Sequence, residues 1–219
     1  MNTGWGFPVV VAPAPLRPAF LPPILLRRAT VSPRFSCAIA PPMTLLPTLP
    51  PTPLRTARLL LRPYLLTDAP AFFALLDAEA ERLQPAFPRR VASVRTYADA
   101  EQQLRLFTEQ WRQRRLLVWG IWQLGTGQYL GDISLQPDSP RIHTGEIGYY
   151  LAAAAEGQGY AREALAAVAD YAFAVLHARR LTLRCRSDNQ RSQATAEALG
   201  FRCEGPDEVG IWHYALTRS

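Results

Sequence analysis

The chain has 219 residues and a mass of 24.4 kDa, which suits one domain with an extension. Hydrophobic residues make up 48% and charged residues 19%, values typical of a globular protein with a sizeable core. No apolar run reaches the roughly 18 residues that a membrane-spanning helix needs, so neither an integral membrane protein nor a membrane partner is expected.

The formal net charge of +6 arises in the N-terminal part of the chain. Residues 1–67 hold seven arginines and no acidic residue. The other 17 of the 24 basic residues and all 18 acidic residues lie after residue 67. The rest of the chain is close to neutral, and nucleic acid is therefore not expected as a partner. All basic residues are arginine, which excludes a Walker A loop because that loop needs lysine.

Residues 1–53 are rich in proline and are expected to form a disordered leader. They hold 13 of the 20 prolines, and pairs such as Pro22-Pro23 can neither continue a helix nor join a central strand. Three interpretations stay open: an over-long start with Met43 as the true initiator, a disordered arm, or a targeting peptide. We rank targeting last and therefore expect a cytoplasmic protein. A nucleic-acid-binding arm is a further hypothesis, which the spacing of the arginines does not favour.

Residues 54–219 are expected to form one folded domain, which begins with a strand and two helices. Arg58–Pro63 is a short apolar strand ended by proline, and a helix opens at Thr67-Asp68. Residues 77–96 contain two prolines and stay ambiguous. Apolar side chains at helical spacing predict a second helix over 97–115.

The second half of the domain is predicted to contain six strands and two helices. The strands are expected over 116–124, 129–135, 145–151, 181–186, 201–204 and 211–216, and the helices over 159–177 and 192–199. The complete order is β-α-α-β-β-β-α-β-α-β-β, which places the chain in the α/β class with a mixed sheet. The tryptophans 111, 119 and 122 are expected in the core.

Cysteines and histidines are not expected to carry the chemistry. The three cysteines, Cys37, Cys185 and Cys203, lack a Cys-x-x-Cys pair, which argues against a disulfide framework and a zinc knuckle. The three histidines have no mutual spacing typical of a metal site or a triad. No metal cofactor is therefore predicted.

The most informative segment is the loop that joins the strand 145–151 to the long helix. Its sequence is Glu156-Gly157-Gln158-Gly159-Tyr160-Ala161. N–H groups at a helix start, together with the helix dipole, can bind phosphate without a basic side chain, and glycine permits close approach. A simple glycine N-cap would explain the same residues. A Rossmann fingerprint is disfavoured because Arg162 stands where its third glycine or alanine would be.

This loop resembles the acetyl-CoA pyrophosphate loop of the GNAT acetyltransferases, Gln/Arg-x-x-Gly-x-Gly/Ala. Gly159 and Ala161 match its fourth and sixth positions, whereas Glu156 stands at the first position. Four further features resemble the Rim-type members, which acetylate ribosomal-protein N-termini. They are Thr56–Pro63 followed by Asp68, Glu146–Leu151, the helix start Gly159–Ala164, and Asn189-x-x-Ser192 followed by Gly200-Phe201.

The resemblance covers about residues 54–217 and implies the GNAT fold, with 145–151 and 181–186 as a splayed pair of parallel strands. It implies an acetyltransferase that uses acetyl-CoA as cosubstrate, without a metal, to acetylate a primary amine. A protein or peptide N-terminus is the expected acceptor. A small-molecule amine, or a catalytically weak acyl-CoA-binding module, are the alternatives. The oligomeric state is expected to be monomer or homodimer.

The resemblance also implies which residues bind the cofactor. Backbone groups of Tyr150 and Leu151 would pair with the pantetheine arm, and Asn189 would bind the same arm with its amide. Backbone groups of the loop would bind the diphosphate: Gly157, Gln158, Gly159, Tyr160 and Ala161. For Asn189 a plain Asx turn is the structural alternative.

Two catalytic residues are implied. Glu146 is the candidate general base, acting on the amine through water, with a solvated strand carboxylate as the alternative. Ser192 is the candidate hydrogen-bond donor to the thiolate, with an N-cap of the following helix as the alternative.

Overall fold

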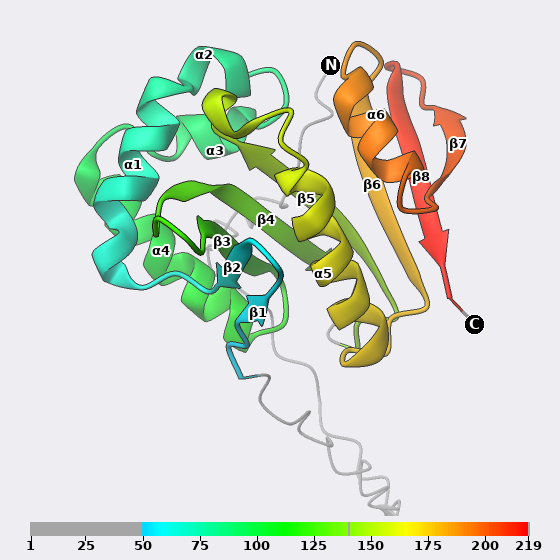
Figure 1. Ribbon diagram of the computed structural model, residues 1–219, viewed down its shortest axis with the longest axis horizontal. Coiled ribbons are helices and arrows are strands. Elements are labelled where there is room, and N and C mark those ends of the chain that lie inside the picture. Colours follow the sequence, from blue (N-terminus) through cyan, green and yellow to red (C-terminus); the bar gives the residue numbers. More distant parts are fainter. Residues whose placement is uncertain (1–49, 140, 219) are drawn as a thin grey trace, which may run out of the picture. The chain divides into compact units, whose positions relative to one another are not determined.

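An eight-stranded mixed sheet forms the centre of the computed structural model, which describes residues 50–139 and 141–218. Every pair of neighbouring strands is antiparallel except β5 and β6 (Figure 1). In spatial order the strands are β1 (Leu54–Arg55), β2 (Leu59–Arg62), β3 (Leu117–Gln123), β4 (Tyr129–Pro137), β5 (Thr144–Leu151), β6 (Arg180–Arg186), β8 (Ile211–Thr217) and β7 (Arg202–Pro206). The expectations about the leader, Met43 and Cys37 concern residues outside the described part.

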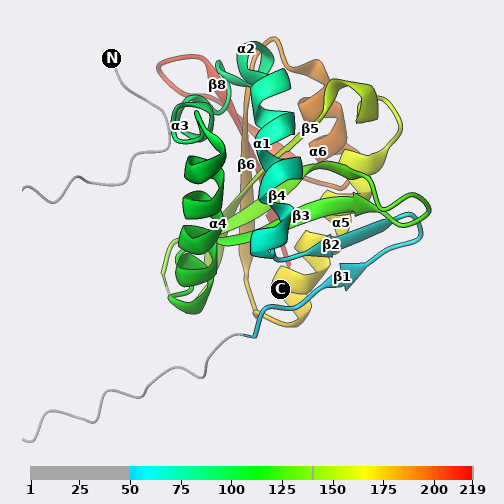
Figure 2. The ribbon, with the colours of Figure 1, turned by 90° about the vertical axis from the view of Figure 1, so that its left-hand side faces the viewer.

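Helices cover both faces of the sheet, as Figure 2 shows with α4 on one side and α5 and α6 on the other. Among the described residues, none of the helices has the length and apolar character needed to cross a bilayer. The helices are η1 (Leu66–Asp68), α1 (Ala69–Ala78), α2 (Ala80–Leu83), α3 (Pro88–Ala92), α4 (Tyr97–Arg112), η2 (Ala153–Ala155), α5 (Tyr160–Ala174) and α6 (Gln190–Glu197).

Two apolar cores lie on opposite faces of this sheet. One gathers side chains of α5, α6 and the sheet together with Trp111 from the end of α4, and the other gathers side chains of α1, the rest of α4 and the sheet. Helix α4 begins at a capping box, in which the side chains of Thr96 and Asp99 each accept the backbone N–H of the other. Its Trp111 contacts Trp119 edge to face with ring centroids 4.8 Å apart, so both belong to the core as expected, whereas Trp122 is half-buried.

The strands and helices predicted from residue 58 onward are present, with ends that differ by a few residues. The predicted opening of the first helix at Thr67-Asp68 is found as the short helix η1, which leads directly into α1. The ambiguous residues 77–96 contain the end of α1 and the short helices α2 and α3. Pro88 occupies the first turn of α3, where its missing N–H costs no hydrogen bond.

A buried carboxylate joins α3 to the sheet. Asp132 on β4 is 2% exposed and accepts hydrogen bonds from Tyr150 (2.9 Å) and Tyr64 (3.2 Å). Arg90 of α3 completes the cluster with an ion pair of 3.0 Å. Burial raises the pKa of the Asp132 carboxyl, although the charge of Arg90 opposes this effect. The cluster therefore depends on Arg90 to balance a charge that is removed from water.

We expect Arg90→Met to lower the free energy of unfolding by about 3–5 kcal/mol, because the Asp132 carboxyl would stay buried without its cation. Urea unfolding at pH 7 measures the change. Arg89→Met is the matched control, since Arg89 lies on the same helix but is exposed and should change stability by less than about 0.5 kcal/mol. Equal losses in the two variants would contradict the role of the buried pair.

Candidate active site

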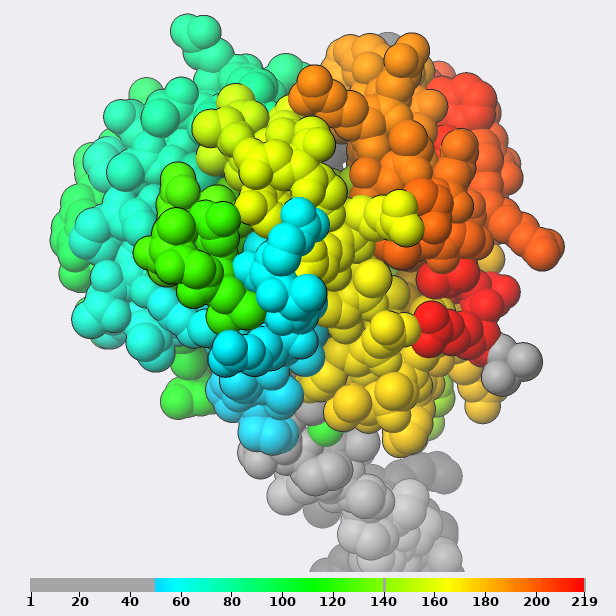
Figure 3. Space-filling model, in the orientation of Figure 1, coloured from blue at the N-terminus to red at the C-terminus, as the bar shows by residue number. Residues whose placement is uncertain are grey.

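The parallel strands β5 and β6 are paired over only part of their length. The pairing runs from Thr144 opposite Arg180 to Ile147 opposite Leu183, and beyond it residues 148–151 pair with β4 alone among the described strands. The two strands therefore splay, as the resemblance implied. In Figure 3 a hollow separates the yellow surface that follows β5 from the orange surface around α6.

The backbone of Leu151 faces this opening. Ala152 donates its N–H to the Leu130 carbonyl of β4, and alternation along a strand turns the preceding residue to the other side. The carbonyl of Leu151 accordingly accepts a hydrogen bond from Arg82 (2.5 Å) rather than from a strand. The side chain of Tyr150 is buried towards α3, with its hydroxyl on Asp132.

The loop after β5 exposes the start of helix α5. Gly157 and Gly159 have φ angles of 74° and 79°, which only glycine adopts without strain. Gly159 is the N-cap and has no side-chain capping bond, so the N–H groups of the first turn lack a partner from the helix or its cap. Such a helix start attracts anions.

The side chains of this loop are engaged in holding it. Gln158 donates to the carbonyl of Ala154 (2.8 Å), and the hydroxyl of Tyr160 accepts a hydrogen bond from Gln123 (3.0 Å). Ala161 packs against the core on the α5 face. The loop is thus shaped by its side chains and leaves its backbone for a ligand.

An ion pair between Glu163 and Arg58, a residue at the start of the domain's sequence, also holds this loop. Glu163 on α5 accepts hydrogen bonds from the side chain of Thr56 (2.5 Å) and from the backbone and side chain of Arg58 (2.9 and 2.7 Å). Arg58 also donates to the carbonyl of Gln158 (3.0 Å), and its guanidinium lies 4.7 Å from the centre of the Tyr160 ring. Two segments that carry the resemblance therefore meet at the loop.

A hollow of about 400 Å³ lies beside this brace. It is lined by Arg58, Gly159, Arg162, Glu163, Ala166 and Leu199. The hollow therefore adjoins both the N-cap of α5 and the guanidinium that holds the loop.

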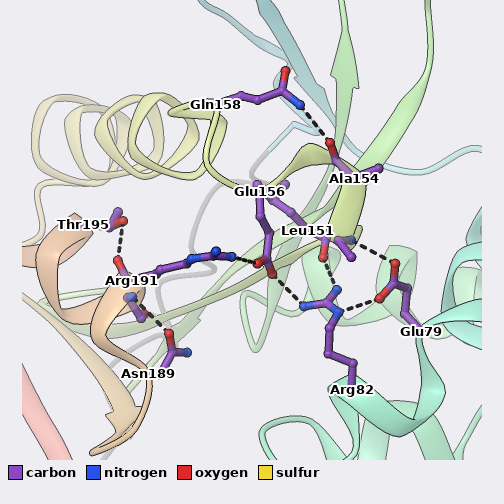
Figure 4. Close-up of polar contacts among 11 residues, drawn as sticks. Glu79, Arg82, Leu151, Ala154, Glu156, Gln158, Asn189, Arg191 and Thr195 are labelled. Carbon is purple, nitrogen blue, oxygen red and sulfur yellow. Dashed lines mark hydrogen bonds and ion pairs between the residues drawn. The ribbon is translucent and has the colours of Figure 1, made fainter.

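The carboxylate of Glu156 is held between two arginines. Arg82 of α2 binds one oxygen at 2.6 Å, and Arg191 of α6 binds the other (Figure 4). Arg82 also binds Glu79, whose second oxygen accepts the N–H of Ala153. Sequence reasoning missed both arginines, because no local pattern connects them to a loop 74 and 35 residues away.

Asn189 and Ser192 lie together at the start of α6. The side-chain oxygen of Asn189 accepts the N–H of Ser192 at 3.1 Å, so Asn189 is the N-cap of this helix and Ser192 is not. The hydroxyl of Ser192, 9% exposed, lies 2.9 Å from that of Tyr149 on β5. Burial raises the pKa of Tyr149, although the hydrogen bond with Ser192 opposes this effect. The two hydroxyls thus bridge β5 and α6.

Glu146 lies on β5 within the paired part of the two strands, apart from the α5 loop. Its carboxylate forms an ion pair of 2.8 Å with Arg184 of β6, and its side chain is 24% exposed. It lines a hollow of about 300 Å³ together with Gln136, Pro137, Asp138, Thr144, Gly145, Arg180 and Thr182. The candidate base is therefore a paired carboxylate at the edge of an open cavity. In the described ranges, no three or more His, Cys, Asp or Glu side chains gather as a metal site would require.

The structure is thus an α/β protein whose mixed sheet opens between two parallel strands beside an uncapped helix start. The chain belongs to the GNAT family: the family described as "Acetyltransferase (GNAT) domain" matches residues 58–202. It is thus an acyltransferase, as the sequence predicted.

The similar proteins include Rim-type enzymes. The chain is 27% identical over 153 residues to the uncharacterized N-acetyltransferase YoaA of Bacillus subtilis, covering 69% of this chain and 84% of that protein. It is 36% identical over 78 residues to the ribosomal-protein-serine acetyltransferase of Escherichia coli, covering 36% of this chain and 44% of that protein. The fold matches a ribosomal L7/L12 alpha-N-protein acetyltransferase in complex with coenzyme A, with a TM-score of 0.69 at 22% identity, covering 76% and 98% of the chains.

We expect Glu163→Gln to lower stability at pH 7 by an amount that disappears in acid. Burial acts to raise the pKa of Glu163, but the hydrogen bonds from Thr56 and Arg58 outweigh it, so the pKa is lowered from its ordinary value. A depressed carboxyl pKa stabilises the fold above the unfolded pKa, and this contribution is lost as pH falls through the folded pKa. Urea midpoints of the two proteins should therefore differ at pH 7 and converge as the pH falls through the folded-state pKa of Glu163. A constant difference across this range would contradict the ion-pair brace.

Proposed function

We propose that the protein transfers the acetyl group of acetyl-CoA to a primary amine, and that the amine is a protein or peptide N-terminus. The reaction is a direct attack within a ternary complex. The observation that supports the proposal most is the opening between β5 and β6 beside the uncapped start of α5. An extended amide-bearing arm that ends in a diphosphate is the ligand chemistry that fits this arrangement.

In this proposal backbone groups bind most of the cofactor. The N–H groups of residues 157–161 bind the diphosphate, as the uncapped start of α5 favours. The pantetheine arm lies between the splayed strands, where the N–H of Leu151 is its partner, because the Leu151 carbonyl is engaged by Arg82. The backbone of Tyr150, the other expected partner, faces β4 by the same alternation. The amide nitrogen of Asn189 is a further donor, because its oxygen is already engaged as the N-cap.

The chain supplies a base and a hydroxyl for the transfer. The amine attacks the thioester carbonyl, the C–N bond forms, and the C–S bond breaks. Glu146 accepts the proton of the amine through water. One of its carboxylate oxygens stays hydrogen-bonded to Arg184 meanwhile, which leaves the other oxygen to accept the proton. Ser192, oriented by Tyr149, donates a hydrogen bond to the leaving thiolate until solvent protonates it. Orientation of the two substrates supplies the rest of the rate.

The names of the similar proteins support the choice of acceptor. The relative from Escherichia coli is a ribosomal-protein-serine acetyltransferase, and the fold neighbour is an alpha-N-protein acetyltransferase. A peptide N-terminus and a small amine both present a primary amine, so the acceptor has to be identified by experiment.

We expect the protein to release CoA from acetyl-CoA when it is given a library of peptides with free N-termini. Mass spectrometry of the library identifies the acetylated sequences, and a panel of small amines is the parallel arm. Acetylation of small amines alone would overturn the peptide assignment. Acetyl-CoA binding by calorimetry, with no CoA released by either panel, would show an acyl-CoA-binding module and contradict the proposed reaction.

We expect Glu146→Gln to lower kcat about a hundredfold, because the substitution removes a proton acceptor and keeps the side chain's shape. Affinity for acetyl-CoA should not change. Glu204→Gln is the matched control, since Glu204 is also an ion-paired strand glutamate, on Arg180, and should keep full activity. Unchanged kcat in Glu146→Gln would leave this carboxylate a structural partner of Arg184.

A further inference from the structure

Two arginines from distant elements converge on Glu156 at the entrance of the α5 loop (Figure 4). Arg82 comes from α2, on the face that carries α1 and α4, and Arg191 comes from the first turn of α6. Glu156 directly precedes Gly157, so both arginines are held at the residue where the glycine loop begins.

The two arginines are held very differently. Arg82 has three acceptors, namely Glu79 (2.5 Å), Glu156 (2.6 Å) and the Leu151 carbonyl (2.5 Å), so its guanidinium is fixed in place. Within the described residues, the guanidinium of Arg191 has Glu156 as its acceptor and its side chain is 76% exposed. Within the described residues, the Arg191 guanidinium can therefore turn away at the cost of its one ion pair, whereas Arg82 would lose three hydrogen bonds.

A diphosphate on this loop would lie near a carboxylate of the same sign, which is unfavourable unless cations balance both. Guanidinium is well suited to phosphate because it offers paired N–H donors in one plane. When Arg191 leaves, Glu156 keeps its ion pair with Arg82, because Arg82 binds the other carboxylate oxygen, although Arg82 is also shared with Glu79. Arg191 is thus the cation that a diphosphate can recruit.

We propose that Glu156 is an internal counter-anion that holds Arg191 in the free protein and yields it to the diphosphate of acetyl-CoA. Arg191 is then a further cofactor-binding residue, and Glu156 competes with the ligand for it. The inference rests on the proposed function, because it requires a diphosphate on the α5 loop. It gives a role to the acidic residue that departs from the Gln or Arg of the family pattern.

The test compares acetyl-CoA with S-acetyl-pantetheine, which carries the same arm and thioester but no phosphate. We expect Glu156→Gln to bind acetyl-CoA about fivefold more tightly by calorimetry, because Arg191 is no longer occupied. We expect Arg191→Gln to bind it about tenfold more weakly. The double variant should lose most of the gain of Glu156→Gln, and the affinity for S-acetyl-pantetheine should not change in any variant.

Arg186→Gln is the matched control, because Arg186 is also an exposed arginine paired with a carboxylate, Asp188, but it lies on β6. Its affinity for both ligands should equal that of the unmodified protein. Unchanged or weaker binding of acetyl-CoA in Glu156→Gln, or normal binding in Arg191→Gln, would overturn the inference and leave the proposed function intact. Parallel losses for both ligands would make Arg191 a structural residue. Failure of the unmodified protein to bind acetyl-CoA would overturn both proposals.

Discussion

The separation of β5 from β6 after Ile147 and Leu183 is the constraint on which the candidate site depends. Backbone groups that lose a strand partner must find another, because an unpaired buried amide or carbonyl is costly. The carbonyl of Leu151 illustrates this, since it accepts a side-chain bond from Arg82 in place of a strand bond. A sheet that closed fully here would have no room for an extended ligand and no backbone groups to offer it.

The opening is framed by contacts between charged and polar side chains. The hydroxyls of Tyr149 and Ser192 join β5 to α6 across it, and the pair of Arg58 and Glu163 holds the loop before α5. These contacts come from separate elements, so the loop keeps its shape while its N–H groups stay available. Side-chain contacts thus stabilise the conformation of this site, and its backbone N–H groups stay available to bind a ligand.

Charge is balanced locally around the loop. Glu163 and Glu156 flank the start of α5, where the helix dipole already favours negative charge, and each carboxylate is paired with arginine. The arginine excess of the chain as a whole says nothing about this balance, because it arises before residue 68. What matters for an anionic ligand is which guanidinium is free to move. Within the described part of the chain the exposure and single acceptor of Arg191 distinguish it from Arg82.

The sequence by itself determined the elements from Arg58 onward and the glycine loop, because periodicity and turn chemistry are local properties. It left residues 77–96 open, since helices as short as α2 and α3 show no sustained period. It also left two alternatives for Ser192, and only the folded chain decided that Asn189 is the N-cap. The sequence could not predict the partners of Glu146 and Glu156. Their partners, Arg184 for Glu146 and Arg82 and Arg191 for Glu156, approach them only when distant strands and helices pack together.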